Sequence, residues 1–266
     1  MSRNFDLLQR AEKELEADHT REVERQREQL QKHVVMAQQT PASPESASAA
    51  EQHRATLEME APARDEVAKL VQRVFLLPGA CKVVSFTGVE EGSGCTWLIS
   101  RAAEVLASQI AGTVCLVDGN FRSPGLHDCF GVKNGYGLTD AVMEGGPIRQ
   151  FARPLGQSNL WLMSGGSMAS NGHTFMGSEP LRARMAELRS AFDYVLIDAP
   201  ALTQGGDAII WGHLADGTVL VMGANSTHRE TARRAAIDLA TANVRLLGAV
   251  LNRRTFPIPD KLYARL

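Results

Sequence analysis

The chain has 266 residues, 44% of them hydrophobic, which is enough for one sizeable core and allows one or two domains. Its 28 Lys and Arg residues against 30 Asp and Glu residues give a net charge of −2, so the composition disfavours nucleic acid as a main partner. The start is charged from Arg3 onward and lacks the apolar stretch of a secretory signal. No apolar run approaches the roughly 18 residues of a membrane span. We therefore expect a soluble cytoplasmic protein.

The first 63 residues are expected to lie outside the main domain. Residues 1–36 are rich in Glu, Arg, Gln and Lys with scattered Leu and Val, which favours a polar helix that has little apolar surface of its own. Such a helix could dock on a partner or stay solvated and partly frayed. Residues 37–63 turn to Ala, Ser, Pro and Gln, the composition of a flexible linker. We predict one main domain over residues 64–266, including a C-terminal tail.

From residue 64 onward, helix and strand patterns alternate. Apolar residues recur at steps of three and four in RDEVAKLVQRVFLL, which predicts a helix that ends before Pro78 and Gly79. The strand pattern CKVVSFT, a glycine-rich turn, the helical TWLISRAAEVLASQI and the strand pattern TVCLVD follow. Further strands are predicted at NLWLMS, DYVLIDAP, GTVLVMG and RLLGAVLN, and helices at 179–190 and 228–241. Apolar strands in alternation with helices predict a doubly wound, mainly parallel α/β sheet that is covered on both faces.

The glycine-rich turn TGVEEGSGCTW, residues 87–97, joins the first strand of this sheet to the next helix, which is where a phosphate-binding loop belongs. Gly92, Ser93 and Gly94 would let the backbone wrap around phosphate oxygens, with amides of the loop and of the helix N-terminus as donors. In the pattern G-x-x-x-x-G-K-[ST], Thr96 stands at the Mg²⁺-binding hydroxyl and Cys95 at the lysine. The alternative is a tight turn without a ligand.

Two aspartates strengthen the prediction of a ligand site. Asp118 ends the strand of CLVDGNFRSP, and Asp198 ends the strand of DYVLIDAP. In an open parallel sheet the carboxyl ends of the strands face the ligand crevice. Two carboxylates aimed at a phosphate loop suit Mg²⁺ binding and the positioning of water. Either aspartate alone could be a helix cap, but together with the loop they predict a nucleotide site.

These segments resemble the cytoplasmic bacterial tyrosine kinases of capsule and exopolysaccharide synthesis, which belong to the deviant P-loop group of MinD and ParA. EEGSGCTW corresponds to the Walker A loop of that family, CLVDGNFRSP to its Walker A′ strand and FDYVLIDAP to its Walker B strand. GLTDAVMEG, ADGTVLVMGANST and LLGAVLNRR also match family segments, and the similarity runs from about Asp65 to the C-terminus. The resemblance implies a P-loop NTPase-like fold of the MinD/ParA type, with ATP or ADP and Mg²⁺ as cofactors.

The resemblance also implies a role for individual residues. Thr96, Asp118 and Asp198 would hold Mg²⁺, and the two aspartates would serve catalysis. Tyr263, the one tyrosine of the tail, would be the phosphate acceptor or a docking aromatic. Asn252 and Arg253 would lie by the nucleotide base. The full nucleotide-binding set is Gly92, Ser93, Gly94, Cys95, Thr96, Trp97, Asn120, Asn252 and Arg253.

The sequence also departs from the family pattern. Cys95 replaces the lysine, Asn120 replaces the second Walker A′ aspartate, and Glu90 stands where MinD-like members carry another lysine. These changes are expected to weaken ATP binding and to impair phosphoryl transfer more, because transfer depends on neutralising charge. Cys95 could be a redox-sensitive thiol or a small space-filling residue. The cations that could compensate are Arg122, Arg253 and Arg254.

The leading hypothesis is a cytoplasmic tyrosine-kinase-like regulator of exopolysaccharide or capsule synthesis or export, with impaired or lost ATP phosphotransfer. Its partner would be a membrane regulator of polysaccharide chain length or export (Wzz-like), which would hold it at the inner face of the membrane. The family's oligomerisation motif E-x-x-R-x-x-R reads Glu66, Lys69 and Gln72, which argues against the ring-like assembly, although a homo-oligomer stays open. The alternatives are an active ATP-dependent tyrosine autokinase and, less favoured, a MinD/ParA-like positioning ATPase.

Overall fold

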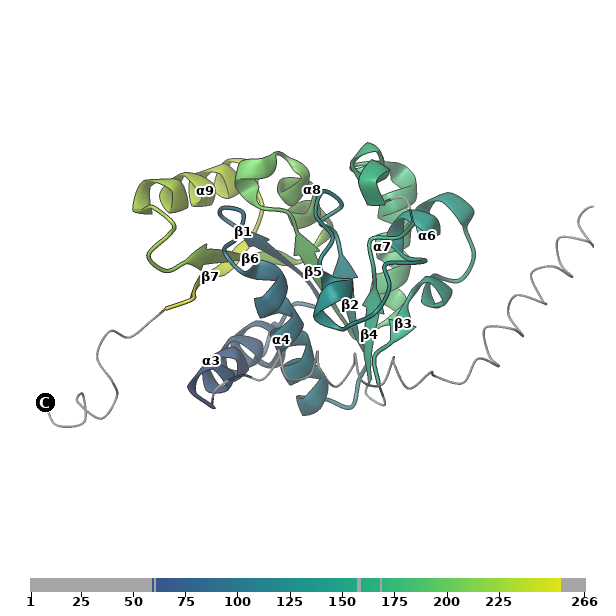
Figure 1. The fold of residues 1–266 in the computed structure, drawn as a ribbon, viewed down its shortest axis with the longest axis horizontal. Helices are drawn as coiled ribbons and strands as arrows, with labels where there is room; N and C mark the ends of the chain where they lie inside the picture. The colour runs from purple at the N-terminus through teal and green to yellow at the C-terminus, as the bar shows by residue number, and fades with distance from the viewer. Residues whose placement is uncertain (1–58, 60, 157–158, 168, 255–266) are drawn as a thin grey trace, which may run out of the picture. The chain divides into compact units, whose positions relative to one another are not determined.

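The computed structural model describes residue 59 and residues 61–156, 159–167 and 169–254 (Figure 1). The helix predicted at 1–36, nearly all of the linker predicted at 37–63 and Tyr263 lie outside the described residues. The helix predicted from residue 64 is confirmed, since α3 spans Ala61–Val71 and continues as a π-helical segment, Gln72–Leu76. Within the described ranges, no helix is both long and apolar enough to cross a membrane.

A seven-stranded sheet forms the centre of the domain, in the order β3-β4-β2-β5-β1-β6-β7. The pairs β4–β2, β2–β5, β5–β1, β1–β6 and β6–β7 are parallel, and β3 pairs antiparallel with β4 at the edge. The strands are β1 Val83–Gly88, β2 Val114–Asp118, β3 Arg153–Pro154, β4 Leu160–Met163, β5 Tyr194–Ala199, β6 Gly217–Gly223 and β7 Leu246–Asn252. The mainly parallel sheet predicted from the sequence is thereby confirmed.

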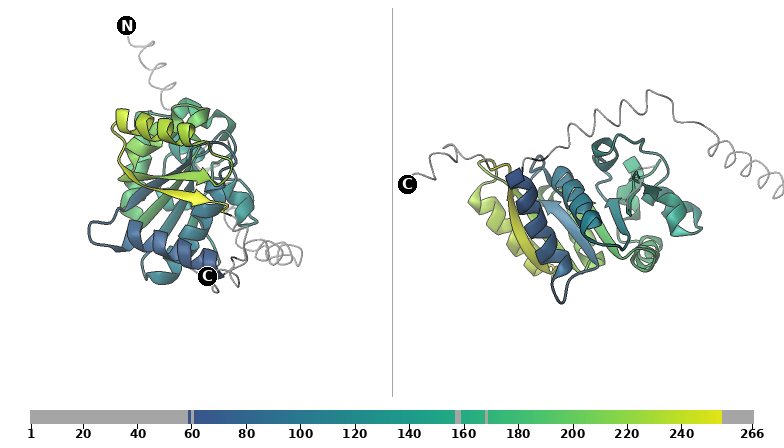
Figure 2. Two further views of the ribbon diagram at one scale, coloured as in Figure 1. Left: turned by 90° about the vertical axis from the view of Figure 1, so that its left-hand side faces the viewer. Right: turned by 90° about the horizontal axis from the view of Figure 1, so that it is seen from below.

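Helices cover both faces of this sheet, which confirms the doubly wound architecture (Figures 1 and 2). On one face, α3 and α4 pack with Val84 and Phe86 of β1. On the other, α7 and α8 pack with Val83. Every residue of β1 is buried, Ser85 and Thr87 included, so the strand lacks the alternation of buried and exposed side chains that a half-exposed strand shows. The remaining helix bounds are α4 Cys95–Gln109, α5 Leu126–Cys129, α6 Leu138–Glu144, α7 Glu179–Ala191, α8 Asp207–Leu214 and α9 Arg229–Thr241.

Several short elements were not predicted from the sequence. Helices α5 and α6 are too short to show a helical period, and α8, with the sequence DAIIWGHL, is apolar nearly all round. Strand β3 has two residues. Among the described residues, 3₁₀ segments also occur at Ile148–Phe151, Ala169–Phe175 and Leu202–Gln204.

Trp211 of α8 holds the backbone that follows β2. Its side chain is fully buried, and its indole N–H donates a hydrogen bond to the carbonyl oxygen of Gly119 at 3.0 Å. A β-carbon built on Gly119 would lie 2.7 Å from the indole ring, so the ring rests directly on this backbone, next to Asp118. We expect Trp211→Phe to lower the free energy of unfolding by about 1–3 kcal/mol, measured by urea denaturation, because it leaves a buried carbonyl unsatisfied.

Trp161 of β4 offers a matched control for this substitution. Its half-buried ring lies 5.5 Å from the guanidinium of Arg149, and Trp161→Phe keeps an aromatic ring beside that cation. We expect Trp161→Phe to cost less than Trp211→Phe. Equal losses would contradict the importance of the hydrogen bond to Gly119.

Candidate nucleotide site

The loop between β1 and α4 has the backbone of a phosphate-binding loop. Gly92 and Gly94 have φ angles of 78° and 79°, a left-handed conformation that residues with a β-carbon rarely adopt. Ser93 is buried, its N–H donates to the carbonyl of Glu90 at 3.3 Å, and its hydroxyl lies against Gly88. Because α4 begins at Cys95, the amides of its first turn have no intrahelical acceptor and are free to bind an anion at the loop.

Asp118 and Asp198 lie side by side at the carboxyl ends of β2 and β5. The two residues are paired in the parallel register, and both are buried. Asp118 accepts hydrogen bonds from the backbone N–H groups of Asn120, Gly125 and Leu126 at 3.3, 3.1 and 3.1 Å. In Asp198, Oδ2 accepts a hydrogen bond from the Thr96 hydroxyl at 2.7 Å, whereas Oδ1 is buried and finds no partner among the described residues. The sequence prediction that strand ends bring these aspartates together therefore matches the structure.

The electrostatics of this carboxylate pair suit a divalent cation. Burial raises the pKa of Asp198 above its usual range, and burial together with the charge of Asp198 raises the pKa of Asp118. No cluster of three His, Cys, Asp or Glu side chains that could hold a metal ion is found in the part of the chain that the structure describes. Mg²⁺ commonly uses only one or two carboxylates and takes its other ligands from water and phosphate. The unpartnered Oδ1 of Asp198, with Thr96 and Asp118 beside it, fits that pattern.

Cys95 stands at the first position of α4, half-buried and close enough to Asp198 to interact with its carboxylate. Burial raises the pKa of its thiol well above the ordinary range, and the charge of Asp198 raises it further. The raised pKa favours the neutral thiol, and neither the thiol nor the thiolate could supply positive charge to the loop. A helix N-terminus alone would favour a reactive thiolate, but the raised pKa argues against one at Cys95. The interpretation of Cys95 as a small space-filling residue is therefore favoured over a redox-sensitive thiol.

The end of β7 closes over the phosphate loop. The side-chain amide of Asn252 donates hydrogen bonds to the carbonyl oxygens of Ser93 and Gly94 at 3.0 and 3.3 Å. A β-carbon built on Gly94 would lie 2.5 Å from Nδ2 of Asn252 and 3.3 Å from Nε of Arg253. Asn252 and Arg253, assigned to the base from resemblance, thus lie against the loop itself.

The other residues singled out from the sequence have different surroundings. Asn120 shapes the turn after β2, where its Oδ1 accepts a hydrogen bond from the Ser123 N–H at 3.3 Å. Trp97 is half-buried against the core between α3, α4 and the sheet. Arg122 is ion-paired with Asp207, Nε to Oδ2 at 3.3 Å, and is thereby partly neutralised.

Thr87 was not identified from the sequence. Its buried hydroxyl donates to the carbonyl oxygen of Pro200 at 2.6 Å, which joins the ends of β1 and β5 beneath the loop. The available signal was a threonine at the end of the first strand, where the glycine-rich turn begins, because a buried hydroxyl needs a hydrogen-bond partner.

Comparison with known proteins identifies the family. No family model matches the chain. Its sequence is 31% identical to the tyrosine-protein kinase YwqD of Bacillus subtilis over 171 residues, which cover 64% of this chain and 72% of that protein. The chain belongs to the bacterial tyrosine-protein kinase family. It is also 25% identical to CapB of Staphylococcus aureus, a putative tyrosine-protein kinase, over 65% of this chain and 75% of CapB. The family predicted from the sequence is confirmed.

Solved structures confirm the fold. The chimerical protein CapA2B2 superposes with a TM-score of 0.67 at 19% identity, covering 72% of this chain and 85% of that one. The MinC:MinD cell division complex of Aquifex aeolicus gives a TM-score of 0.55 at 21% identity, over 69% of this chain and 72% of that one. The P-loop fold shared by bacterial tyrosine kinases and MinD is therefore the fold of this chain.

Asn252 offers a test of how the loop is held. Asn252→Ala removes both hydrogen bonds to the loop carbonyls, so we expect faster hydrogen exchange across residues 92–97 and a loss of about 1 kcal/mol in unfolding free energy. Asn134→Ala is the control, because Asn134 accepts one hydrogen bond, from the Gly166 N–H, away from this loop. Unchanged exchange of residues 92–97 in Asn252→Ala would show that the loop is ordered without β7.

Proposed function

We propose that this chain is a tyrosine-kinase-like regulator of exopolysaccharide or capsule synthesis or export, with impaired or lost ATP phosphotransfer. The observation that carries the proposal is the composition of the loop: a kinase-family fold keeps Thr96, Asp118 and Asp198 together, while a neutral thiol at Cys95 occupies the place of the lysine. Catalysis of phosphoryl transfer rests on positioning and on neutralising charge. The site retains the positioning groups and lacks that cation.

The residues present assign a role to each part of the site. Gly92, Ser93, Gly94 and the first-turn amides of α4 would hold phosphate oxygens. Thr96 and the two aspartates, with the unpartnered Oδ1 of Asp198, would hold Mg²⁺. When bound, Mg²⁺ supplies positive charge to phosphate oxygens. Asp118, fixed by three backbone N–H groups, cannot reorient easily and would orient a ligand beside the cation.

The expected size of each effect indicates that the missing lysine impairs phosphoryl transfer more than nucleotide binding. One charge-assisted phosphate contact contributes about 1.5–3 kcal/mol to binding. Removing one preorganised donor from a transition state slows the reaction by a factor of about 10²–10³. Glu90 and the exposed Glu91 add negative charge beside the loop. Nucleotide binding is therefore weakened, and phosphoryl transfer is reduced much further.

The proposed partner is a membrane regulator of polysaccharide chain length or export, with the chain on the cytoplasmic face of the membrane. In this proposal residues 1–36 form a polar helix that contacts the partner, residues 37–63 form a linker, and residues 64–266 form the nucleotide-site domain. On α3, Lys69 pairs with Glu66 of the same helix at 2.7 Å, and both side chains are exposed.

The test is phosphotransfer by the purified full chain with labelled ATP and Mg²⁺ or Mn²⁺. We expect no label on Tyr263 or on any other tyrosine, while an active bacterial tyrosine kinase assayed in parallel becomes labelled. In cells that lack the chain, exported polysaccharide should change in amount or length, and Asp118→Ala should restore it as well as the native chain does.

An active autokinase is the alternative, and the intact group of Thr96, Asp118 and Asp198 favours it. Label that reaches Tyr263 in the native chain and disappears in Asp118→Ala would establish this alternative and overturn the proposal. A polysaccharide phenotype that Asp118→Ala fails to restore would point the same way.

A further inference from the structure

A phosphate loop without its lysine needs another cation if it is to hold a nucleotide. Arg122 is engaged by Asp207, and Lys82 lies at the opposite end of β1, where its backbone N–H contacts Asp216. Arg253 is in a different position. Its Nε lies 3.3 Å from where a β-carbon on Gly94 would be, so the side chain rests on the loop one residue before Cys95.

Hydrogen bonds of Asn252 and Arg253 fix the backbone that places Arg253 against the phosphate loop. The Ala224 N–H donates to the Asn252 carbonyl at 2.7 Å, and the Asn252 side chain bonds the loop carbonyls. Oδ1 of the same side chain accepts a hydrogen bond from the Arg253 N–H at 2.9 Å. Arg253 then takes a left-handed φ of 56°, unusual for a residue with a side chain, which turns the chain out of β7 at the loop.

We propose that Arg253 supplies the missing positive charge of the phosphate loop, binding the phosphate groups of a nucleotide in place of the lysine that Cys95 replaces. The inference rests on the nucleotide site assigned under the proposed function. A guanidinium is permanently charged and donates two parallel hydrogen bonds to phosphate oxygens, and the exposed Arg253 side chain is free to make them.

This assignment differs from contact with the base, which resemblance alone suggested for Arg253. A phosphate contact is electrostatic and depends on the number of ligand charges, whereas a base contact is the same for adenosine and ATP. The proposed role of Arg253 also differs from a catalytic role. A cation that enters from the end of β7 restores phosphate binding without occupying position 95, where the family carries its lysine. Nucleotide binding and absent phosphotransfer can therefore occur in the same protein.

The experiment measures binding of Mg²⁺–ATP, Mg²⁺–ADP and adenosine to the full chain by calorimetry and by displacement of a fluorescent ATP analogue. We expect Arg253→Ala to weaken ATP and ADP by about tenfold or more, and adenosine hardly at all. Arg253→Lys should fall between, since one ammonium replaces a two-pronged donor. Arg254→Ala, which removes the same charge one residue later, should change ATP affinity by less than about threefold.

Three results would overturn the inference: no ATP binding by the native chain, unchanged affinity in Arg253→Ala, or an equal loss for adenosine and ATP. Circular dichroism of each variant separates lost binding from lost folding. None of these results depends on phosphotransfer. The inference can therefore fail while the proposed function stands, and labelled tyrosine would overturn the proposed function without touching the role of Arg253.

Discussion

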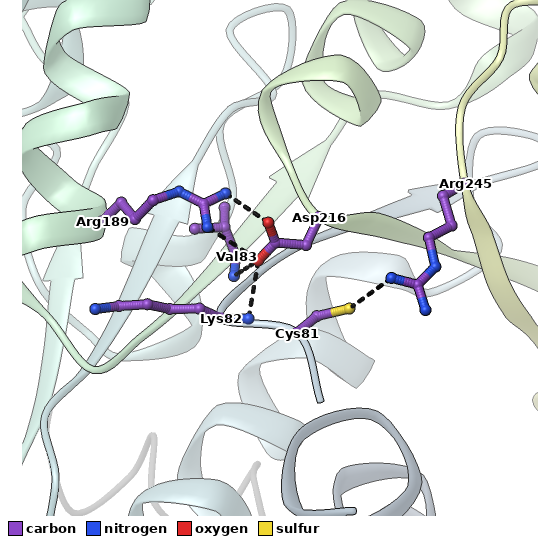
Figure 3. Close-up of polar contacts among 6 residues, drawn as sticks. All are labelled: Cys81, Lys82, Val83, Arg189, Asp216 and Arg245. Carbon is purple, nitrogen blue, oxygen red and sulfur yellow. Dashed lines mark hydrogen bonds and ion pairs between the residues drawn. The ribbon is translucent and has the colours of Figure 1, made fainter. Parts of the chain in front are cut away.

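Asp216→Ala is expected to lower the free energy of unfolding by about 2–3 kcal/mol, after allowance for the partial exposure of the side chain. Figure 3 shows why: Oδ2 of Asp216 accepts hydrogen bonds from the backbone N–H groups of Lys82 and Val83 at 2.9 and 2.8 Å. Arg189 of α7 adds a two-pronged contact, Nη2 to Oδ1 at 2.7 Å and Nη1 to Oδ2 at 3.2 Å. One carboxylate thus ties the starts of β1 and β6 to α7.

Two further variants separate the contributions to this contact. Asp216→Asn keeps an oxygen acceptor for the backbone N–H groups but loses the ionic attraction to Arg189, so it should lose less stability than Asp216→Ala. Arg189→Ala removes only a partly exposed partner and should cost about 1 kcal/mol or less. Urea denaturation at neutral pH measures all three. An equal loss in Arg189→Ala and Asp216→Ala would show that the backbone contacts contribute nothing.

The same residue predicts how stability depends on pH. Burial opposes ionisation of Asp216, but the hydrogen bonds from Arg189, Val83 and Lys82 outweigh burial and hold its pKa below the usual value of 3.8. The folded state therefore releases the proton more readily than the unfolded state, and this stabilisation is present above the unfolded pKa. It is lost as pH falls below about 4 towards the folded pKa. The stability difference between the native chain and Asp216→Asn should shrink over that range, and a constant difference down to about pH 2 would contradict the assignment.

Sequence reasoning placed two candidate site residues correctly, because their positions follow from the ends of parallel strands. Asp118 and Asp198 each follow an unbroken apolar run, and parallel pairing of β2 with β5 then places them opposite one another. The positions of Gly92 and Gly94 were also predictable, since a loop that wraps around a phosphate needs residues able to take the left-handed φ that both glycines adopt. Both inferences need only the local pattern and the rule that carboxyl ends of parallel strands share one edge.

What the sequence could not provide are contacts between distant segments. Asn252 and Ser93 are far apart along the chain, and no pattern near either residue indicates that an amide will meet a loop carbonyl. The pairing of Arg122 with Asp207 likewise depends on where α8 begins, and α8 itself shows no helical period. Which arginines lie near the phosphate loop is therefore determined by the fold and cannot be read from the local sequence. Of the three candidate arginines, the fold places Arg253 against the loop and engages Arg122 elsewhere.

A second experiment places the family's lysine back in the phosphate loop, at position 95. Cys95→Lys is expected to tighten Mg²⁺–ATP binding by about tenfold or more, because it adds a charge-assisted phosphate contact at the start of α4. A lysine ammonium beside Asp198 also favours the ionised form of the buried carboxylates, which prepares them for Mg²⁺. Calorimetric titration of the variant and the native chain with ATP and ADP measures the gain.

Cys95→Met is the matched control, since methionine gives an unbranched side chain of similar bulk without charge. If Cys95→Met binds ATP as tightly as Cys95→Lys, then the shape of the side chain at position 95, and not its charge, determines the ATP affinity of the loop. The inference about Arg253 adds a further condition: in the Cys95→Lys background, the additional change Arg253→Ala should cost less ATP affinity than it does in the native chain, because two cations then share one phosphate group. Asn120 is unchanged in this variant, so tighter binding without labelled tyrosine would show that a lysine at position 95 is not sufficient for phosphoryl transfer.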